Sequence, residues 1–254
     1  MDTDIAVTIE DGTTGVVPSV PLAGDVALVR ISGELGSEGG RRLLTELESV
    51  LRSRPRVVAD VSGVVLTHSA SVHAFADALE RAGGWPAVAL VLVAPAPTLA
   101  ALLEHSHVSR RVPTFDDLPT GLARVDERPE LVRAWWHFEV DPRAPREARS
   151  YVRRVCSDWS IDDDACEAAE IVVTELVTNA VEHAASPSVV EVTRVAGSFR
   201  MTVRDFVSDP LPDAVLPPPS SVRGRGLAMV AAVSRDWGVQ THADGKTVWS
   251  ELAV

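Results

Sequence analysis

The stretch EIVVTELVTNAVEHA, residues 170–184, places three polar side chains along a largely apolar segment. Glu175, Asn179 and His183 follow one another at four-residue steps. The apolar spacing predicts a helix, and residues four apart on a helix point in nearly the same direction. A carboxylate can accept a proton or orient an attacking hydroxyl, and an asparagine carbonyl oxygen is a hard ligand suited to Mg²⁺ beside phosphates. Taken alone, such a pair is more often an ordinary solvated stripe.

Two further groups follow along the chain. Asp205 ends the predicted strand SFRMTVRDF, where a long proline-rich loop begins. A buried carboxylate there would accept a hydrogen bond from the exocyclic amine of adenine, although strand-end aspartates also commonly start turns. Next, RGRGLAMV opens a helix at Gly224 and Gly226, where unpaired backbone N–H groups and the helix dipole favour phosphate oxygens, and Arg223 and Arg225 add positive charge. A lone G-x-G has little specificity, whereas the order of all these elements is specific.

In this order, the elements from about residue 134 to 254 resemble the Bergerat-fold ATPases, which include gyrase, MutL and the histidine kinases. They are most similar to the anti-sigma-factor serine kinases and their actinobacterial relatives. The likeness is carried by ELVTNAVEHA, by GRGLAMV and by the terminal WGVQTHADGKTVWSEL. The resemblance implies a pocket for ATP and Mg²⁺ beneath a flexible lid.

By position, the resemblance also implies a role for individual residues. Glu175 would be the catalytic base and Asn179 the magnesium ligand. Asp205 would recognise adenine, and Thr247, in GKTVW, would help to hold the adenine edge. Three residues would contact the phosphates, namely Gly224, Arg225 and Gly226.

The sequence departs from the family pattern after the adenine aspartate. The usual segment is D-x-G-x-G, but here it is DFVSD, with Val207 and Asp209 in the glycine positions. Glycines there let the backbone turn closely around the nucleotide, so a valine restricts that freedom and an inward aspartate would repel phosphate. Two interpretations therefore stay open: a serine/threonine protein kinase, or a non-catalytic module in which ATP gates binding to protein partners.

These residues need elements to position them, and the two halves of the chain supply different ones. Strand and helix patterns alternate through residues 22–125, which predicts a mixed sheet covered by helices, an α/β fold. In the second half a strand over 134–141 precedes two long helices and then runs of strands, which predicts an α+β fold. The resemblance implies that this fold is a Bergerat-type α/β sandwich. The charged, proline-containing segment 126–134 predicts the boundary between domains 1–125 and 134–254.

The first half resembles a STAS domain, the fold of anti-anti-sigma factors, through VALVRISGEL and VVADVSGVVLTHSASVHAF. In that family, a serine at a helix start receives phosphate from the partner kinase. The matching residue here is Ala70, which has no hydroxyl group. Ser69 and Ser71 flank it, and we expect them to cap the helix. The resemblance thus implies a regulatory domain that lacks the usual phosphate acceptor.

Composition limits the kinds of partner. The chain has 254 residues and a formal net charge of −12, which disfavours non-specific binding to nucleic acid or anionic lipid.

The uncharged run 82–103 is interrupted by Pro86, Pro95 and Pro97, which favours a strand and a helix over a membrane span. The acidic N-terminus does not look like a signal peptide, and two cysteines without a C-x-x-C motif suit a reduced cytoplasm.

The sequence thus predicts a cytoplasmic regulator of the partner-switching type that binds ATP and Mg²⁺. Its expected partner is a STAS-type anti-anti-sigma protein, a sigma factor or both, without direct contact to nucleic acid or membrane. A sensor histidine kinase is disfavoured because His137 lies in a strand-like run rather than in a dimerisation helix. Homodimer formation, the stimulus and the particular sigma factor stay open.

Overall fold

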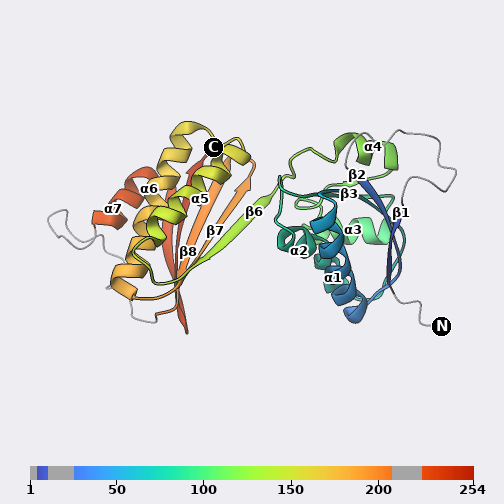
Figure 1. Ribbon diagram of the computed structural model, residues 1–254, viewed down its shortest axis with the longest axis horizontal. Helices are drawn as coiled ribbons and strands as arrows, with labels where there is room; N and C mark the ends of the chain where they lie inside the picture. The colour runs from blue at the N-terminus through green and yellow to red at the C-terminus, as the bar shows by residue number, and fades with distance from the viewer. Residues whose placement is uncertain (1–4, 11–25, 208–224) are drawn as a thin grey trace. The chain divides into compact units, whose positions relative to one another are not determined.

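The computed structural model describes residues 5–10, 26–207 and 225–254. The chain divides into two compact units, residues 1–132 and residues 133–254 (Figure 1). The division falls within the charged segment 126–134. Each unit has its own sheet and its own helices, and each is described by itself below.

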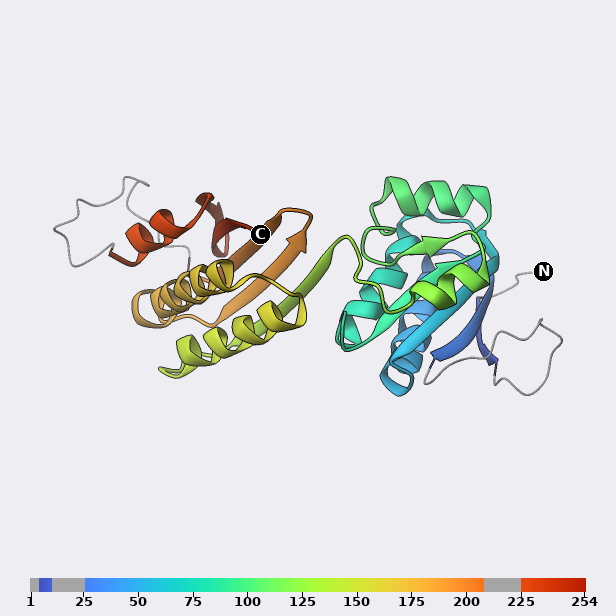
Figure 2. The same cartoon turned by 90° about the horizontal axis from the view of Figure 1, so that it is seen from above.

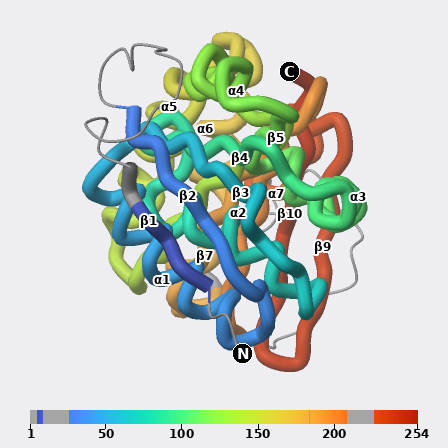
Figure 3. The backbone as a smooth tube through the Cα atoms, turned by 90° about the vertical axis from the view of Figure 1, so that its right-hand side faces the viewer, coloured from blue at the N-terminus to red at the C-terminus, as the bar shows by residue number. Residues whose placement is uncertain are grey.

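A five-stranded mixed sheet forms the N-terminal unit, in the order β1-β2-β3-β4-β5. Its strands are β1 (Ala6–Glu10), β2 (Val26–Leu35), β3 (Arg56–Leu66), β4 (Ala89–Val93) and β5 (Thr114–Phe115). β1 pairs antiparallel with β2, beside which it runs in Figure 3, and the other pairs are parallel. The predicted mixed sheet is confirmed, whereas the acidic sequence around β1 gave no strand signal.

Helices cover both faces of this sheet. They are α1 (Ser37–Ser53), the 3₁₀ turn η1 (Ser69–Val72), α2 (His73–Arg81), α3 (Pro97–His105) and α4 (Leu118–Arg124). Along β3, Val57 and Ala59 belong to the core beneath α1, α2 and α3, whereas the intervening Val58 packs on the side of α4. The uncharged run 82–103 forms β4 and part of α3, and no helix in the described part of the chain is long and apolar enough to cross a membrane.

A second five-stranded sheet forms the C-terminal unit, in the order β6-β7-β8-β10-β9. Its strands are β6 (Val132–Phe138), β7 (Ser188–Val195), β8 (Ser198–Asp205), β9 (Asp236–His242) and β10 (Gly245–Ala253). Its helices are α5 (Ala144–Asp158), α6 (Asp163–Asn179), the π-helical turn η2 (Ala180–Ala184) and α7 (Arg225–Val233). In Figures 1 and 2, α5 and α6 lie side by side over one face of the sheet.

Helix α6 is fixed at its start and along its inner face. The Asp162 carboxylate caps it by accepting a hydrogen bond from the Ala165 N–H at 2.9 Å, and the acidic first turn suits the helix dipole. The buried face contains Val172, Val173, Leu176 and Val177. Helix α6 packs against β8 and β10. Because its apolar face points toward these strands, the neighbouring polar side chains of α6 lie along the edge of the packed face.

The two cysteines have different surroundings. Cys156 is buried in α5, whereas Cys166, near the start of α6, is half-buried. Burial raises the pKa of the Cys156 thiol above its ordinary value, and a hydrogen bond with Cys166 raises that pKa further. Because only the thiolate attacks an alkylating reagent, Cys156 stays protonated and unreactive at neutral pH.

We expect iodoacetamide at pH 8 to modify Cys166 in the folded protein and to modify Cys156 only after unfolding in denaturant. Peptide mass spectrometry over a time course measures both rates. Modification of Cys156 at the rate of Cys166 in the native protein would contradict the burial described here.

Candidate functional site

Glu175 and Asn179 lie one turn apart near the end of α6, and both are half-buried. They border the apolar face that includes Leu176 and packs toward the sheet. Within the described residues, neither side chain has a hydrogen-bond or ion-pair partner. The structure therefore places a carboxylate and an amide together at one helix end, without a hydrogen-bond partner in the described part of the chain.

The start of α7 lies against Glu175. A Cβ atom built on Gly226 would stand 2.5 Å from the Glu175 Oε2 atom, closer than real side chains approach one another. Glycine therefore allows the first turn of α7 to reach the carboxylate of α6. Gly224 and Asp209 lie outside the described residues, as does the side chain of Arg225.

Two hydrogen bonds connect the end of α6 to the end of β8. The Ser186 N–H donates to the Ala180 carbonyl at 3.2 Å, and the Phe206 N–H donates to the Ser186 hydroxyl at 2.9 Å. The chain reaches Ser186 through η2, a π-helical turn, where the sequence predicted a regular helix through residue 184. The described structure does not include the side chain of His183, the third member of the predicted stripe. These bonds hold Asn179 and Asp205 at the same end of the unit.

Asp205 is buried at the end of β8, and its carboxylate has two partners. Its Oδ2 atom is 2.9 Å from the Lys246 Nζ atom, and its Oδ1 atom accepts a hydrogen bond from the Val207 N–H at 3.2 Å. Gly245 has a φ of +148° and passes so close to the Asp205 carbonyl that no other residue would fit there. This close approach places Lys246 directly opposite the carboxylate.

Three polar side chains form a row across the sheet, which we call the polar row: Ser188, Asp205 and Lys246. Asp205 on β8 pairs with Ser188 on β7 and with Lys246 on β10, so all three side chains share one face of the sheet. Ser188 is 1% exposed, and its hydroxyl has no hydrogen-bond partner among the described residues. Because an unpaired buried hydroxyl is costly, the Ser188 hydroxyl has the capacity for a hydrogen bond with a group other than the described residues.

The structure does not bring Thr247 together with Asp205. Thr247 pairs with Arg204, so it lies on the opposite face of the sheet from the polar row. Its hydroxyl is 3.0 Å from the His242 Nε2 atom. Lys246 occupies the position beside Asp205 instead, and sequence reasoning missed both Lys246 and Ser188. The signal available was the strand alternation, which places adjacent residues of β10 on opposite faces.

The residues present fit a nucleotide with a magnesium ion. Asp205 can accept a hydrogen bond from a base, and Ser188 has an unsatisfied hydroxyl beside it. Glu175 and Asn179 offer hard oxygen atoms. Mg²⁺ often takes only one or two protein ligands beside phosphates and waters. The described residues include no group of three or more histidine, cysteine or acidic side chains that could hold a metal.

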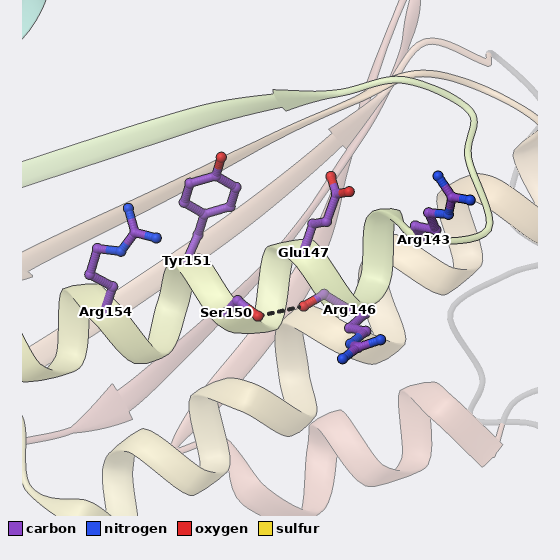
Figure 4. A pocket seen from close by; sticks show the side chains of 6 residues that line it. All are labelled: Arg143, Arg146, Glu147, Ser150, Tyr151 and Arg154. Atoms are coloured by element: carbon purple, nitrogen blue, oxygen red, sulfur yellow. Dashed lines mark hydrogen bonds between the residues drawn. The ribbon is translucent and has the colours of Figure 1, made fainter.

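A separate surface cavity of about 410 Å³ lies along α5 (Figure 4). It is lined by Arg143, Arg146, Glu147, Ser150, Tyr151 and Arg154. The Tyr151 ring stacks on Trp136 at 5.3 Å between centroids, and the Arg154 guanidinium lies 5.4 Å from the Tyr151 centroid. None of the residues of the polar row lines this cavity, nor do Glu175 and Asn179.

Comparison with known families identifies the class of the second unit. Residues 138–251 match the family model described as histidine kinase-like ATPase domain. The C-terminal part of this chain is therefore a histidine kinase-like ATPase domain, a class that implies ATP binding. The match ends within β10 and includes every residue of the candidate site.

Several solved structures are similar to parts of the chain. The RsbU and RsbW domains of a Mycobacterium tuberculosis protein share 20% identity over 47% of this chain and 31% of theirs, with a TM-score of 0.38. An anti-sigma factor antagonist from Mycobacterium paratuberculosis shares 21% over 49% of this chain and 96% of its own, with a TM-score of 0.39. The phosphorylated Bacillus protein SpoIIAA shares 14% over 47% and 99%, with a TM-score of 0.33. The antagonists are structural neighbours of the N-terminal region. No curated protein matches the chain significantly.

The contact between Gly226 and Glu175 can be tested by substitution. In Gly226→Ala the new methyl group displaces the flexible Glu175 carboxylate, so we expect a stability loss of about 1 kcal/mol or less but a loss of ATP affinity of about tenfold or more. Thermal unfolding and calorimetry with Mg·ATP measure the two effects. Wild-type affinity in this variant would show that the close approach of α7 is not needed for binding.

Proposed function

We propose that the C-terminal unit binds Mg·ATP and transfers its γ-phosphate to a serine or threonine of a separate STAS-type protein. The observation that carries this proposal is the meeting of Glu175 on α6 with the start of α7, near a strand end where Asp205 is buried. An acid can position the attacking hydroxyl, a helix start can face the phosphates, and a buried acceptor can hold the base.

Each residue then has a specific task. Mg·ATP supplies the transferable phosphoryl group when bound. Glu175 accepts the proton of the attacking hydroxyl, and the Asn179 amide oxygen serves as a magnesium ligand. Asp205 accepts a hydrogen bond from the base, and backbone N–H groups in the first turn of α7, around Gly226, face the phosphates. Gly224 and Arg225 retain their predicted phosphate contacts in this proposal, whereas Lys246 takes the place predicted for Thr247.

The N-terminal unit is proposed to be a STAS-type regulatory domain that its own kinase does not modify. At the position of the family's acceptor serine, Ala70 is exposed in η1. The neighbouring Ser71 is buried, and its hydroxyl donates to the Gly36 carbonyl at 2.8 Å. A domain of this kind can occupy or release the kinase without receiving phosphate. The proposed setting is the cytoplasm, with a sigma factor as a further candidate partner.

A second candidate function is ATP-gated binding without phosphoryl transfer. It is favoured by Val207, whose N–H group is already engaged by the Asp205 carboxylate, at a position where the family has a flexible glycine. In this case ATP would change which protein the unit binds, and Glu175 would not act as a base. The two functions therefore make opposite predictions for a variant that lacks the Glu175 carboxylate.

We expect Glu175→Gln to reduce phosphoryl transfer about 100-fold or more, because the amide cannot accept the proton, while Mg·ATP affinity changes only a few-fold. Transfer is measured with labelled ATP and a purified STAS-type protein encoded in the same genome. Glu182→Gln, which alters an exposed acid on the neighbouring turn η2, is the matched control. Undiminished transfer by Glu175→Gln would favour gated binding.

We also expect the wild-type chain to receive no phosphate on its N-terminal unit, because Ala70 occupies the acceptor position and Ser71 is buried, while the exposed Ser69 lies one position before the acceptor. The Ala70→Ser variant restores an exposed hydroxyl and should acquire phosphate there, on its own chain or on a second copy. Mass spectrometry after incubation with Mg·ATP locates the phosphate. Stoichiometric phosphate on Ser69 or Ser71 of the wild type would contradict this regulatory role.

A further inference from the structure

We propose that Cys156 and Cys166 form an oxidation site, at which a peroxide converts the two thiols into a disulfide that joins α5 to α6. These are the two cysteines of the chain. The inference is independent of the proposed function, because it concerns the contact between two helices and not the candidate nucleotide site. It comes from the alignment of the helices, which brings the two thiols together.

The register between α5 and α6 is marked by an ion pair. Residues 159–162 turn the chain back after α5, so the two helices run antiparallel and lie side by side (Figures 1 and 2). Arg153 on α5 donates two hydrogen bonds to the Glu170 carboxylate on α6, both at 2.6 Å. These two residues therefore lie opposite each other.

The same register places the cysteines opposite each other. Cys156 lies one helical turn after Arg153 on α5, and Cys166 lies one turn before Glu170 on α6. In antiparallel helices, a step forward on one helix and the same step back on the other reaches a facing pair. The structure agrees, because the two thiols are close enough to share a hydrogen bond.

The two thiols differ in how an oxidant can reach them. Cys166 is half-buried, and its Sγ atom lies 3.9 Å from the Glu170 Oε1 atom. Cys156 is only 2% exposed and lies behind it. A small peroxide therefore meets Cys166 first, and the sulfenic acid formed there has a second thiol beside it. A sulfenic acid condenses readily with a neighbouring thiol.

The reaction balances with hydrogen peroxide as the oxidant. The Cys166 thiolate attacks one peroxide oxygen, the O–O bond breaks, and the departing hydroxide takes up the proton that the thiol released. The Cys156 sulfur then attacks the Cys166 sulfur, the S–O bond breaks, and the hydroxyl leaves as water with the Cys156 proton. Two thiols are oxidised to one disulfide, and one peroxide is reduced to two waters. Dithiothreitol reverses the change by thiol–disulfide exchange.

Oxidation of the full chain tests the inference. The reduced wild type, Cys156→Ala and Cys166→Ser are treated with a small excess of hydrogen peroxide near neutral pH, with and without dimedone, which traps sulfenic acids. Peptide mass spectrometry without reduction locates the products, and thermal unfolding measures the Tm before and after treatment. Circular dichroism verifies that each variant is folded, and Cys166→Ser is the matched control because it retains only the shielded thiol.

The wild type should form a disulfide within one chain and gain about 4 °C or more in Tm, because the bond restricts the unfolded chain, and dithiothreitol should restore the original Tm. Cys156→Ala should instead give a dimedone adduct on Cys166, and Cys166→Ser should stay unmodified. Oxidation of wild-type Cys166 to sulfinic acid while Cys156 remains a thiol would overturn the inference, whether or not the variants fold. A bond only between two chains, or a fall in Tm on oxidation, would also overturn it.

Discussion

The packing of one face of α6 against β8 and β10 is the constraint on which the candidate site depends. Burial of residues such as Val172 and Leu176 fixes the rotation of the helix about its axis, and each such side chain contributes about 1.5–3 kcal/mol. With that rotation fixed, Glu175 and Asn179 can only lie at the border of the core, where α7 begins. The positions of the polar groups are thus a consequence of the apolar ones.

A second constraint is the cost of placing charges inside the unit. Asp205 and Lys246 are both largely buried, and removing either partner would leave the other as an uncompensated charge, at a cost of about 3–5 kcal/mol. Replacing both by apolar residues is often neutral or even stabilising, so such a pair is weak evidence for a purely structural role. The unpaired Ser188 hydroxyl next to it leads to the same conclusion. Stability alone therefore does not explain the polar row.

The sequence predicted most of the elements, because their apolar periods are strong, as in α1 with its buried Leu43, Leu47 and Leu51. It also predicted the mixed sheet of the first unit and the helix that holds Glu175 and Asn179. It could not show that Lys246, rather than Thr247, lies beside Asp205, because a shift of one residue in strand register exchanges the two faces. Nor could it show the π-helical turn at Ala180–Ala184, since the residue spacing there also fits a regular helix; the turn is followed by a local backbone bond from the Ser186 N–H to the Ala180 carbonyl.

The bond from the Ser71 hydroxyl to the Gly36 carbonyl has a further consequence for how information passes through the chain. Gly40 packs so tightly on Ser71 that even a methyl group there would collide with it, so the Ser71 hydroxyl is shielded. With alanine at the position of the family's acceptor serine, this surface carries no hydroxyl at that position. Under the proposed function, in which this unit receives no phosphate, any signal it conveys would depend on concentration and competition among binding partners, and its reversal would require no phosphatase.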